Sequence, residues 1–370
     1  ESRAVCNPPH SSLASRDFPA IPRPTMESTK VAILGASGYT GMELVRLLLV
    51  HPAAQITAAT SRTHAGRRLD EVFPRFARLP GAEQPFIEPD MDAVAASGAT
   101  IAFLALPHGT AAEYATALLE RGLRVIDLSA DFRLRKAEIY EDFYGEEHPT
   151  PELLTTAIYG LPEIRREEIF SARLVASPGC YPTSILLPLI PLLREGLIDP
   201  TTIIANSMSG VSGAGRKADL GLLFVECNES VRAYGIPRHR HLSEIEQELS
   251  AAAGENVVIT FVPHLIPVNN GISTTTTTAL RGNLADVERA LRSTYENSSF
   301  VRLLGPGACP DTKNVTRTNF IDIGWHHDDR TGRLLLLSAE DNLGKGAAGQ
   351  SVQSFNIMTG LPEMTGLGTV

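Results

Sequence analysis

The stretch VAILGASGYTGMELVRLL, residues 31–48, joins a short apolar run, a turn with three glycines and an amphipathic segment. The apolar run predicts a buried strand, and the amphipathic segment predicts a helix. Gly35, Gly38 and Gly41 remove side chains from the turn, so the backbone can approach a pyrophosphate whose charge the helix N-terminus stabilises. The spacing G-x-x-G-x-x-G differs from the usual G-x-G-x-x-G, and a plain strand–helix turn is the alternative. The position between a first strand and a helix favours a dinucleotide site.

The same alternation continues to about residue 135. Apolar runs typical of buried strands (AQITAAT, TIAFLAL and RVIDLS) are separated by helical patterns such as GTAAEYATALLERG. This order predicts an α/β fold with a Rossmann-type, doubly wound parallel sheet. From about Cys180 strands follow strands, and the run GISTTTTTAL is β-branched and therefore favours a strand. The second half therefore predicts an α+β domain with a mostly antiparallel sheet.

These patterns predict the domain organisation. Residues 26–178 together with 340–370 are expected to form the dinucleotide-binding domain, and residues 179–339 a catalytic and dimerisation domain. Residues 1–25 are rich in Pro, Ser and Arg without periodicity, which predicts a disordered extension.

Composition excludes several classes of function. The formal charge of −9 provides no basic stripe for nucleic acid, and no apolar run approaches the ~18–20 residues of a membrane span. Cys6, Cys180, Cys227 and Cys309 form no C-x-x-C pair, so neither a metal site nor a disulfide framework is expected. A reduced, cytoplasmic setting fits this cysteine usage.

The end of the second expected strand indicates which dinucleotide binds. An NAD site usually has an acid there, whereas this chain has Ser61 and Arg62 and no acid until Asp70. A hydroxyl and a guanidinium suit a 2′-phosphate, which favours NADP(H) over NAD. A surface arginine without a ligand is the alternative. Pro107 and His108 follow a later strand and are expected beside the cofactor, although His108 also fits an exposed loop.

The stretch SPGCYPTSILLPLIPLL, residues 177–193, places Cys180 on a Pro-Gly turn before an expected helix at Ser184–Arg194. A helix N-terminus stabilises a thiolate, so a lowered thiol pKa and a nucleophilic role are expected. His239 and His241 offer an acid/base, although each also fits a surface histidine.

Two further sequence features complete the expected site. Downstream of His241, Ser243 and Glu246 have the spacing of a capping box. The stretch SMSGVSGAGRK, residues 207–217, is a glycine-serine loop whose Arg216 suits a phosphate or carboxylate, although a flexible turn is the alternative. A dinucleotide site, a thiol on a turn and histidines together indicate aldehyde-level redox chemistry through a thioester.

At this point the motifs resemble those of the N-acetyl-γ-glutamyl-phosphate reductase family, which is related to aspartate-semialdehyde dehydrogenase. The similarity covers essentially residues 30–360. Its motifs stand in the expected order as GASGYTG, LALPHG, VIDLSADFRL, IYGLPE, LVASPGCYPTSILLPLIPL, SGVSGAGRK, HRHLSEI, FVPHLIP and NLGKGAAGQSVQ.

The resemblance implies NADPH-dependent reduction of N-acetyl-γ-glutamyl phosphate to the semialdehyde and phosphate, a step of arginine biosynthesis, by a homodimer or homotetramer. It implies that Cys180 is the nucleophile and that His241, as its imidazolium, donates the proton when the thiolate is expelled. The implied cofactor residues are Gly35, Ser37, Gly38, Tyr39, Thr40, Gly41, Ser61, Arg62, Pro107, Ser212, Gly213 and Asn342. The implied substrate-binding residues are Arg133, Ser177, Arg216 and His239.

Three other functions remain open. A reductase of another acyl phosphate (aspartyl phosphate or carrier-linked aminoadipyl phosphate) uses the same chemistry, but a carrier-linked substrate favours a basic surface that this acidic chain lacks. A non-catalytic NADP-sensing regulator needs no activated thiol. A cysteine hydrolase leaves the glycine-rich turn without a purpose.

Overall fold

The structure is a computed structural model that describes residues 28–368 with the exception of residue 217. The predicted disordered extension, residues 1–25, lies outside the described residues. Within the part of the chain that is described, no helix is long and apolar enough to cross a membrane.

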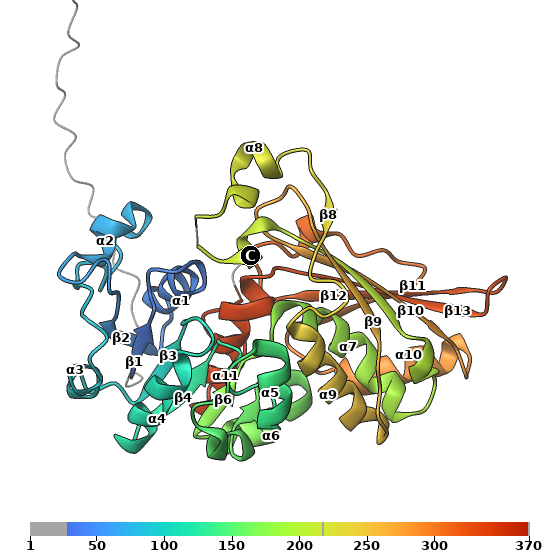
Figure 1. Cartoon of the computed structure of the whole chain (residues 1–370), viewed down its shortest axis with the longest axis horizontal. Coiled ribbons are helices and arrows are strands. Elements are labelled where there is room, and N and C mark those ends of the chain that lie inside the picture. The colour runs from blue at the N-terminus through green and yellow to red at the C-terminus, as the bar shows by residue number, and fades with distance from the viewer. Residues whose placement is uncertain (1–27, 217, 369–370) are drawn as a thin grey trace, which may run out of the picture.

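The first sheet lies in the N-terminal half, at the blue and green end of the ribbon (Figure 1). Its six strands follow the order β2-β1-β3-β4-β6-β5, and all neighbours are parallel. The strands are β1 (Thr29–Leu34), β2 (Ala54–Ala59), β3 (Ile101–Leu104), β4 (Arg124–Asp127), β5 (Ile158–Tyr159) and β6 (Leu174–Ala176). The predicted doubly wound parallel sheet is confirmed.

Helices cover both faces of this sheet because its strands are apolar on both sides. On one face α1 packs against Val31 and Ile33, and on the other α4 packs against Ala32 and Leu34. The helices of this half are α1 (Tyr39–Leu49), α2 (Leu69–Val72), α3 (Met91–Ala96), α4 (Ala111–Glu120), α5 (Ala137–Tyr144) and α6 (Pro162–Ser171).

The second sheet has seven strands in the order β11-β12-β13-β10-β7-β9-β8. Neighbours are antiparallel except for the pairs β11–β12 and β7–β9, so the predicted mostly antiparallel sheet is confirmed. The threonine run forms β10, as expected. The strands are β7 (Ile204–Ser209), β8 (Arg232–Ala233), β9 (Thr260–Leu265), β10 (Ile272–Ala279), β11 (Val301–Pro306), β12 (Ile321–Asp328) and β13 (Arg333–Glu340).

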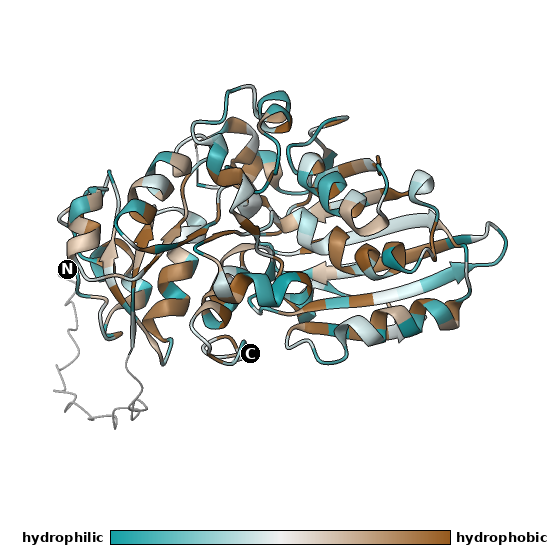
Figure 2. Ribbon diagram, turned by 90° about the horizontal axis from the view of Figure 1, so that it is seen from below, coloured by the Kyte–Doolittle hydropathy of each residue, from teal (hydrophilic) through white to brown (hydrophobic). Residues whose placement is uncertain are grey.

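Three helices pack on one face of the second sheet, around a core that includes the buried Trp325. They are α7 (Cys180–Arg194), α9 (His241–Ala253) and α10 (Leu284–Tyr295). Along β7, by contrast, Ile204, Asn206 and Met208 are exposed on the opposite face. Figure 2 shows the result: strands of the first sheet are mostly brown, whereas long strands of the second carry white and teal segments.

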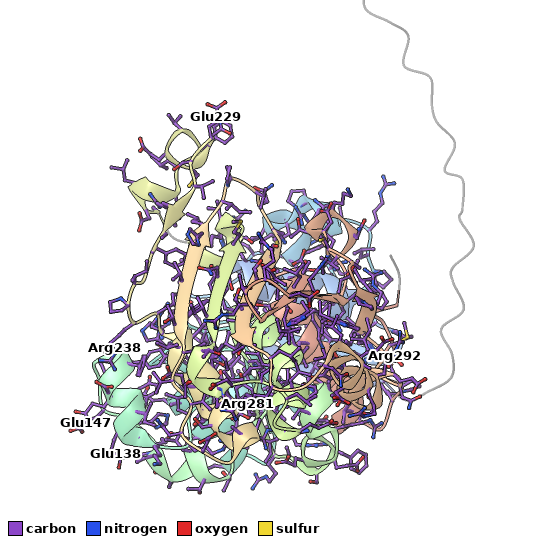
Figure 3. The ribbon with its side chains drawn as sticks, turned by 90° about the vertical axis from the view of Figure 1, so that its right-hand side faces the viewer. Glu138, Glu147, Glu229, Arg238, Arg281 and Arg292 are labelled. Atoms are coloured by element: carbon purple, nitrogen blue, oxygen red, sulfur yellow. The ribbon has the colours of Figure 1, made fainter. Side chains whose placement is uncertain are left out.

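Two segments complete the molecule. The short α8 (Phe224–Cys227) lies in a lobe that projects beside the second sheet, with Glu229 at its tip (Figures 1 and 3). The C-terminal α11 (Gly349–Met358) returns to the first sheet, where the Phe355 ring lies 5.9 Å from that of Phe103. Arg124 of β4 also donates to the Met358 carbonyl over 2.7 Å. The chain therefore closes the first core with its last helix.

Two expected helix starts are wrong. Helix α7 begins at Cys180 rather than Ser184 and continues through Pro188 and Pro191. Helix α9 begins at His241, so Ser243 lies inside it and donates to the Arg240 carbonyl, while Glu246 accepts from the Ile259 backbone. The predicted capping box is absent because both side chains have closer partners elsewhere.

Candidate active site

Cys180 is the first residue of α7, and Gly179 before it is the N-cap without a side-chain hydrogen bond. The preceding turn leaves the carboxyl end of β6, where the Ser177 N–H donates to the Asp127 carbonyl of β4 over 2.7 Å. The Ser177 hydroxyl pairs with that of Ser351 on α11 at 2.8 Å. The parallel sheet thus delivers the thiol to its carboxyl edge, where ligands bind in such folds.

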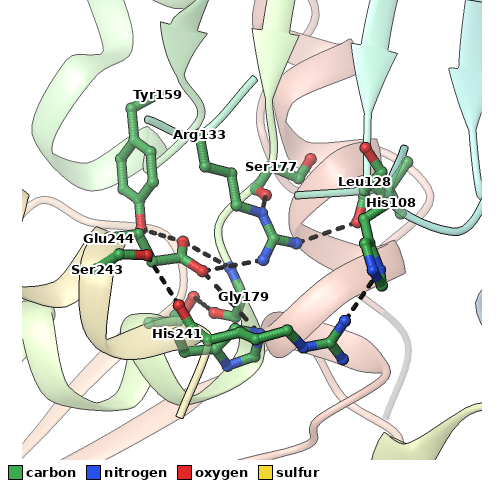
Figure 4. Close-up of polar contacts among 12 residues, drawn as sticks. His108, Leu128, Arg133, Tyr159, Ser177, Gly179, His241, Ser243 and Glu244 are labelled. Atoms are coloured by element: carbon green, nitrogen blue, oxygen red, sulfur yellow. Dashed lines mark hydrogen bonds and ion pairs between the residues drawn. The ribbon is translucent and has the colours of Figure 1, made fainter. Parts of the chain in front are cut away.

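A buried ion pair holds the turn that carries the thiol (Figure 4). The Arg133 guanidinium donates to the Glu244 carboxylate over 2.9 Å, to the Ser177 carbonyl over 2.8 Å and to the Leu128 carbonyl over 3.0 Å. Burial opposes the charge of Arg133, but Glu244 raises its pKa overall. Three of its donors are therefore used within the protein. The Arg133 guanidinium thus holds the turn that carries Cys180, and its predicted role in substrate binding stays a prediction.

Glu244 connects this pair to the other catalytic candidates. It accepts from the Gly179 N–H over 3.1 Å and from the Tyr159 hydroxyl over 2.9 Å. Its Oε1 lies 4.0 Å from His241 Nε2. A Cβ on Gly179 would lie only 2.6 Å from that nitrogen, so glycine is required for His241 to approach the turn. The structure therefore places Gly179, the neighbour of Cys180, against the ring of His241.

His241 is neutral in this environment. Burial lowers the pKa of its ring well below 6.5, and the nearby His239, Arg133 and Arg240 lower it further. Its Nδ1 is buried and has no hydrogen-bond partner among the described residues. A neutral imidazole accepts protons, so His241 fits a base that must gain its proton before it can give one.

The pKa of the Cys180 thiol differs from the expected lowering. Burial raises its pKa to about 12, and Glu340 raises it further, against smaller opposing effects of the Tyr181 backbone and Arg133. The expected lowering by the helix start is therefore overturned in the free protein, since desolvation of a thiolate outweighs it. The sulfur is a neutral thiol until a base removes its proton.

His239 lies in an aromatic cluster beside His241. Its ring centroid is 4.9 Å from that of His241 and about as close to those of Tyr181, Tyr234 and Phe261, and its Nδ1 accepts from the His241 backbone. Burial, with the Arg240 charge, lowers its pKa to about 4. The ring is thus a neutral wall of the site near neutral pH.

The glycine turn has the conformation that a dinucleotide site needs. Gly35 has φ +76°, and a Cβ there would meet the Ala105 carbonyl at 2.4 Å. A Cβ on Gly41 would meet the Gly35 carbonyl at 2.3 Å. No side chain caps α1 at Gly38, so the first-turn N–H groups of Tyr39, Thr40 and Gly41 face outward without a capping oxygen from the described residues. These residues fit a bound pyrophosphate.

The expected 2′-phosphate residues flank this turn. The Ser61 hydroxyl pairs with that of Ser37 at 2.9 Å, which joins the end of β2 to the glycine turn. Arg62 is exposed and donates to the Tyr114 hydroxyl over 3.1 Å. Its guanidinium meets no carboxylate within hydrogen-bond distance among the described residues, which leaves it able to bind an anion.

A second group of expected cofactor residues also meets in space. Asn342 is buried, donates to the Ser212 hydroxyl over 2.9 Å and accepts from the Gly271 N–H over 2.8 Å. Its amide nitrogen lies 3.7 Å from the Cβ position of Gly213. Asn342 thus fixes the glycine-serine loop after β7.

Two contacts join the second half of the chain to the loops around the dinucleotide turn. Arg216 donates to the Ser37 carbonyl over 3.0 Å and lies over the Tyr39 ring, so it reaches the glycine turn, whereas the sequence analysis assigns it to the substrate. Arg240, next to His241, pairs with His108 over 2.9 Å (Figure 4). His108 follows the exposed Pro107 in the loop after β3, whose Leu106 contacts the Gly35 position.

Sequence reasoning missed Glu244 and its partner Tyr159. The signal was present, because Glu244 stands three residues after His241 and so shares its helix face. That spacing was assigned to Ser243 and Glu246 instead. Among the described residues, no group of histidine, cysteine or acidic side chains has the arrangement of a metal site.

Comparison with known families agrees with this arrangement. Residues 30–172 match the family described as semialdehyde dehydrogenase, NAD binding domain. Residues 180–342 match the semialdehyde dehydrogenase, dimerisation domain. Between the two matches lie residues 173–179, which contain β6 and the turn before Cys180.

Curated relatives are more specific. An N-acetyl-gamma-glutamyl-phosphate reductase of Akkermansia muciniphila is 60% identical over 92% of this chain and 99% of its own length. The chain belongs to the N-acetyl-gamma-glutamyl-phosphate reductase family. A member from Moorella thermoacetica is 49% identical over 91% of this chain and 97% of its own length.

Solved structures agree in fold. An aspartate semialdehyde dehydrogenase of Candida albicans, determined with NADP, matches with a TM-score of 0.68 and 16% identity over 90% of this chain and 98% of that chain. An aspartate semialdehyde dehydrogenase II of Vibrio cholerae matches with a TM-score of 0.67 and 17% identity, over 90% of this chain and 98% of that chain. At this identity the likeness establishes the shared fold.

Proposed function

We propose that this protein reduces N-acetyl-γ-glutamyl phosphate to N-acetylglutamate semialdehyde and phosphate with NADPH, a step of arginine biosynthesis. The observation that carries the proposal is the 60% identity to a reductase of this name over nearly its whole length. The geometry supports it, because a thiol on a helix start, a neutral histidine and a dinucleotide turn lie on connected elements.

The first step forms a thioester. The neutral His241 ring accepts the thiol proton of Cys180, and the sulfur attacks the γ-acyl carbon of the substrate. The bond from that carbon to the phosphate oxygen breaks, and phosphate leaves with the electron pair. Because the thiol pKa is raised to about 12, the sulfur depends on this base for its reactivity.

The second step releases the aldehyde. NADPH, held by the residues named below, would supply the hydride for reduction of the acyl group on sulfur. His241 then holds the proton taken from Cys180 and returns it as the carbon–sulfur bond breaks. This order keeps the expected proton donation by the His241 imidazolium and adds its source, since the neutral ring becomes an imidazolium when it takes the proton of Cys180.

The cofactor residues follow from the same geometry. The N–H groups from Gly35 to Gly41 would hold the pyrophosphate, Ser61 and Arg62 the 2′-phosphate, and the Ser212–Gly213 loop with Asn342 the nicotinamide end. Pro107 would line the same path. Arg216 is proposed for a cofactor phosphate, because its guanidinium already reaches Ser37.

Among the substrate candidates, His239 is the one whose ring packs against the ring of His241. Arg133 and the Ser177 backbone are proposed to position the thiol, since their polar groups are bonded to each other. This assignment predicts that a substitution of Arg133 reduces kcat more than it raises KM for the acyl phosphate.

An assembly of two or four identical chains is also proposed. Its support is the family description of residues 180–342 as a dimerisation domain and the apolar side chains exposed in the lobe around α8. Phe224 and Val225 are 80% and 83% exposed in the single chain. Light scattering of the purified protein tests this proposal. The proposal also includes a small acyl phosphate as the substrate and the cytoplasm as the location of the protein.

The decisive assay follows NADPH oxidation with N-acetylglutamyl phosphate, and separately with aspartyl phosphate and a carrier-linked acyl phosphate. Turnover with the first substrate alone supports the proposal. Turnover only with another acyl phosphate, or tight NADPH binding without turnover on any of them, replaces it with a different reductase or with a regulator. Cys180→Ser is expected to abolish turnover and leave NADPH binding intact.

A further inference from the structure

Glu340, the last residue of β13, has a fully buried carboxyl group to which the reaction gives no role. Its exposed fraction is 0%, and both carboxyl oxygens are buried without a hydrogen bond from any of the described residues. Its neighbours across the sheet are Ile272 on β10 and Ile321 on β12, both fully buried. Burial of a carboxyl group without hydrogen bonds costs free energy of folding, so its surroundings decide its charge.

It faces the start of the nucleophile helix. Two residues earlier on the same face of β13, the Ser338 hydroxyl donates to the Ser184 carbonyl of α7 over 2.7 Å. Two residues along a strand cover about the same length as one helical turn, so Glu340 is level with Cys180, four residues before Ser184. Gly346 confirms the register, because a Cβ there would lie 2.8 Å from the Cys180 Cβ and 3.1 Å from Glu340 Oε1.

Charged groups act on Glu340 in both directions. Lys345 favours its carboxylate form, but the Lys345 Nζ is shared, because it donates to Glu163 over 2.6 Å and to Gln353 over 2.8 Å. Asp341 and Glu163 add negative charge near Glu340, and on the other side of Cys180 the Arg133 charge is balanced by Glu244. Across these packed elements, a carboxylate at Glu340 is the charge that acts most directly on the sulfur.

We propose that Glu340 is a positioning residue for the proton of Cys180: its carboxyl group keeps the sulfur a neutral thiol in the free protein, because carboxylate and thiolate oppose one another in one apolar pocket. The pair therefore carries at most one negative charge over the working pH range. The thiol then resists adventitious alkylation and becomes a nucleophile when His241 accepts its proton. Burial raises the pKa of Glu340 well above 4.5, and burial followed by the charge of Glu340 raises that of Cys180, in agreement with such a pair.

The test measures alkylation of Cys180 by iodoacetamide against pH, with the modified peptide quantified by mass spectrometry so that Cys227 and Cys309 do not contribute. Glu340→Gln keeps the shape and removes the charge. We expect the midpoint of its profile to lie about one pH unit or more below that of the unaltered protein, which near pH 9.5 is about a tenfold faster reaction. Glu340→Leu, which matches the flanking isoleucines, should show the same acceleration.

Ser338→Ala is the matched control, because it removes a contact between the same strand face and the same helix without changing charge. Its alkylation profile should be unchanged. Thermal unfolding identifies any variant that fails to fold, and the leucine variant is expected to fold because its surroundings are apolar. If the two Glu340 variants and the control share the profile of the unaltered protein, the proposal is overturned. A slower reaction in the leucine variant alone also overturns it, since the carboxyl group would then assist the sulfur.

This inference deepens the proposed function, because it concerns the same thiol. Its readout is independent of turnover, however. If the protein has no acyl phosphate reductase activity but its alkylation profiles shift as expected, the proposed function is wrong and the role of Glu340 is retained.

Discussion

Replacing Glu244 by Gln tests how the buried ion pair supports catalysis. Its side chain is 2% exposed and that of Arg133 is 9% exposed, so the change leaves the arginine charge buried without its carboxylate. An amide also has one oxygen to accept with, whereas the carboxylate accepts from Arg133, Gly179 and Tyr159. Breaking a buried pair by removing one partner costs about 3–5 kcal/mol, and we expect a loss of that size in the free energy of unfolding.

The expected effect on catalysis follows from the Gly179 hydrogen bond. Without it the turn that carries Cys180 loses its anchor to α9, and a displacement of about 1 Å at a reacting group costs about 100-fold in kcat. Denaturant unfolding and steady-state kinetics measure the two effects on the same preparation.

Glu246→Gln is the matched control on the same helix. Glu246 is half-buried and accepts one hydrogen bond, from the Ile259 backbone, which an amide oxygen can replace. We expect Glu246→Gln to lower the free energy of unfolding by no more than about 1 kcal/mol and to leave kcat unchanged. Equal stability and equal kcat for Glu244→Gln and Glu246→Gln would refute the role given to the ion pair.

Three further outcomes follow from the site. Gly179→Ala puts a Cβ 2.6 Å from His241 Nε2, so kcat should fall about 100-fold while the NADPH dissociation constant, measured by fluorescence, stays the same; normal kcat would contradict the packing. Arg62→Ala should raise KM for NADPH about tenfold and leave KM for NADH unchanged, with Arg67→Ala inert in both; equal effects on the two cofactors would argue against a 2′-phosphate contact. Because the His241 pKa is lowered, the base stays deprotonated to lower pH than an ordinary histidine, and the acid limb of kcat/KM should lie well below pH 6.5; a limb at the ordinary histidine value would contradict a buried base.

Much of the fold follows from local patterns. The apolar runs and the glycine turn at Gly35–Gly41 indicate parallel strands with helical crossovers, and the β-branched threonine run indicates a strand. Which threonines of that run are buried is decided by the fold. These patterns act over a few residues, which is why they predict elements and their order. The start of α7 was placed four residues late because Pro182 and the Pro-Gly turn suggest a loop, although proline is compatible with the first turn of a helix.

The chemistry of single groups depends on distant neighbours. The thiol pKa of Cys180 is raised by burial and by Glu340, which is 160 residues later in the chain. Glu244 acquires its role by meeting Arg133, Tyr159 and Gly179, which no local spacing connects. Arg216 has a side chain suited to any anion, and only the folded chain shows that it reaches Ser37. Residue type indicates what a group can do, and tertiary contacts decide which of these it does.

The central claim is that the sulfur of Cys180 carries the acyl group between release of phosphate and reduction. Rapid mixing of the protein with N-acetylglutamyl phosphate in the absence of NADPH, followed by acid quench and peptide mass spectrometry, tests it directly. We expect a burst of one phosphate per active site and an N-acetylglutamyl thioester on the peptide that contains Cys180, with neither in Cys180→Ser. Phosphate release without an acyl group on that peptide, or an acyl group on another residue, would contradict it.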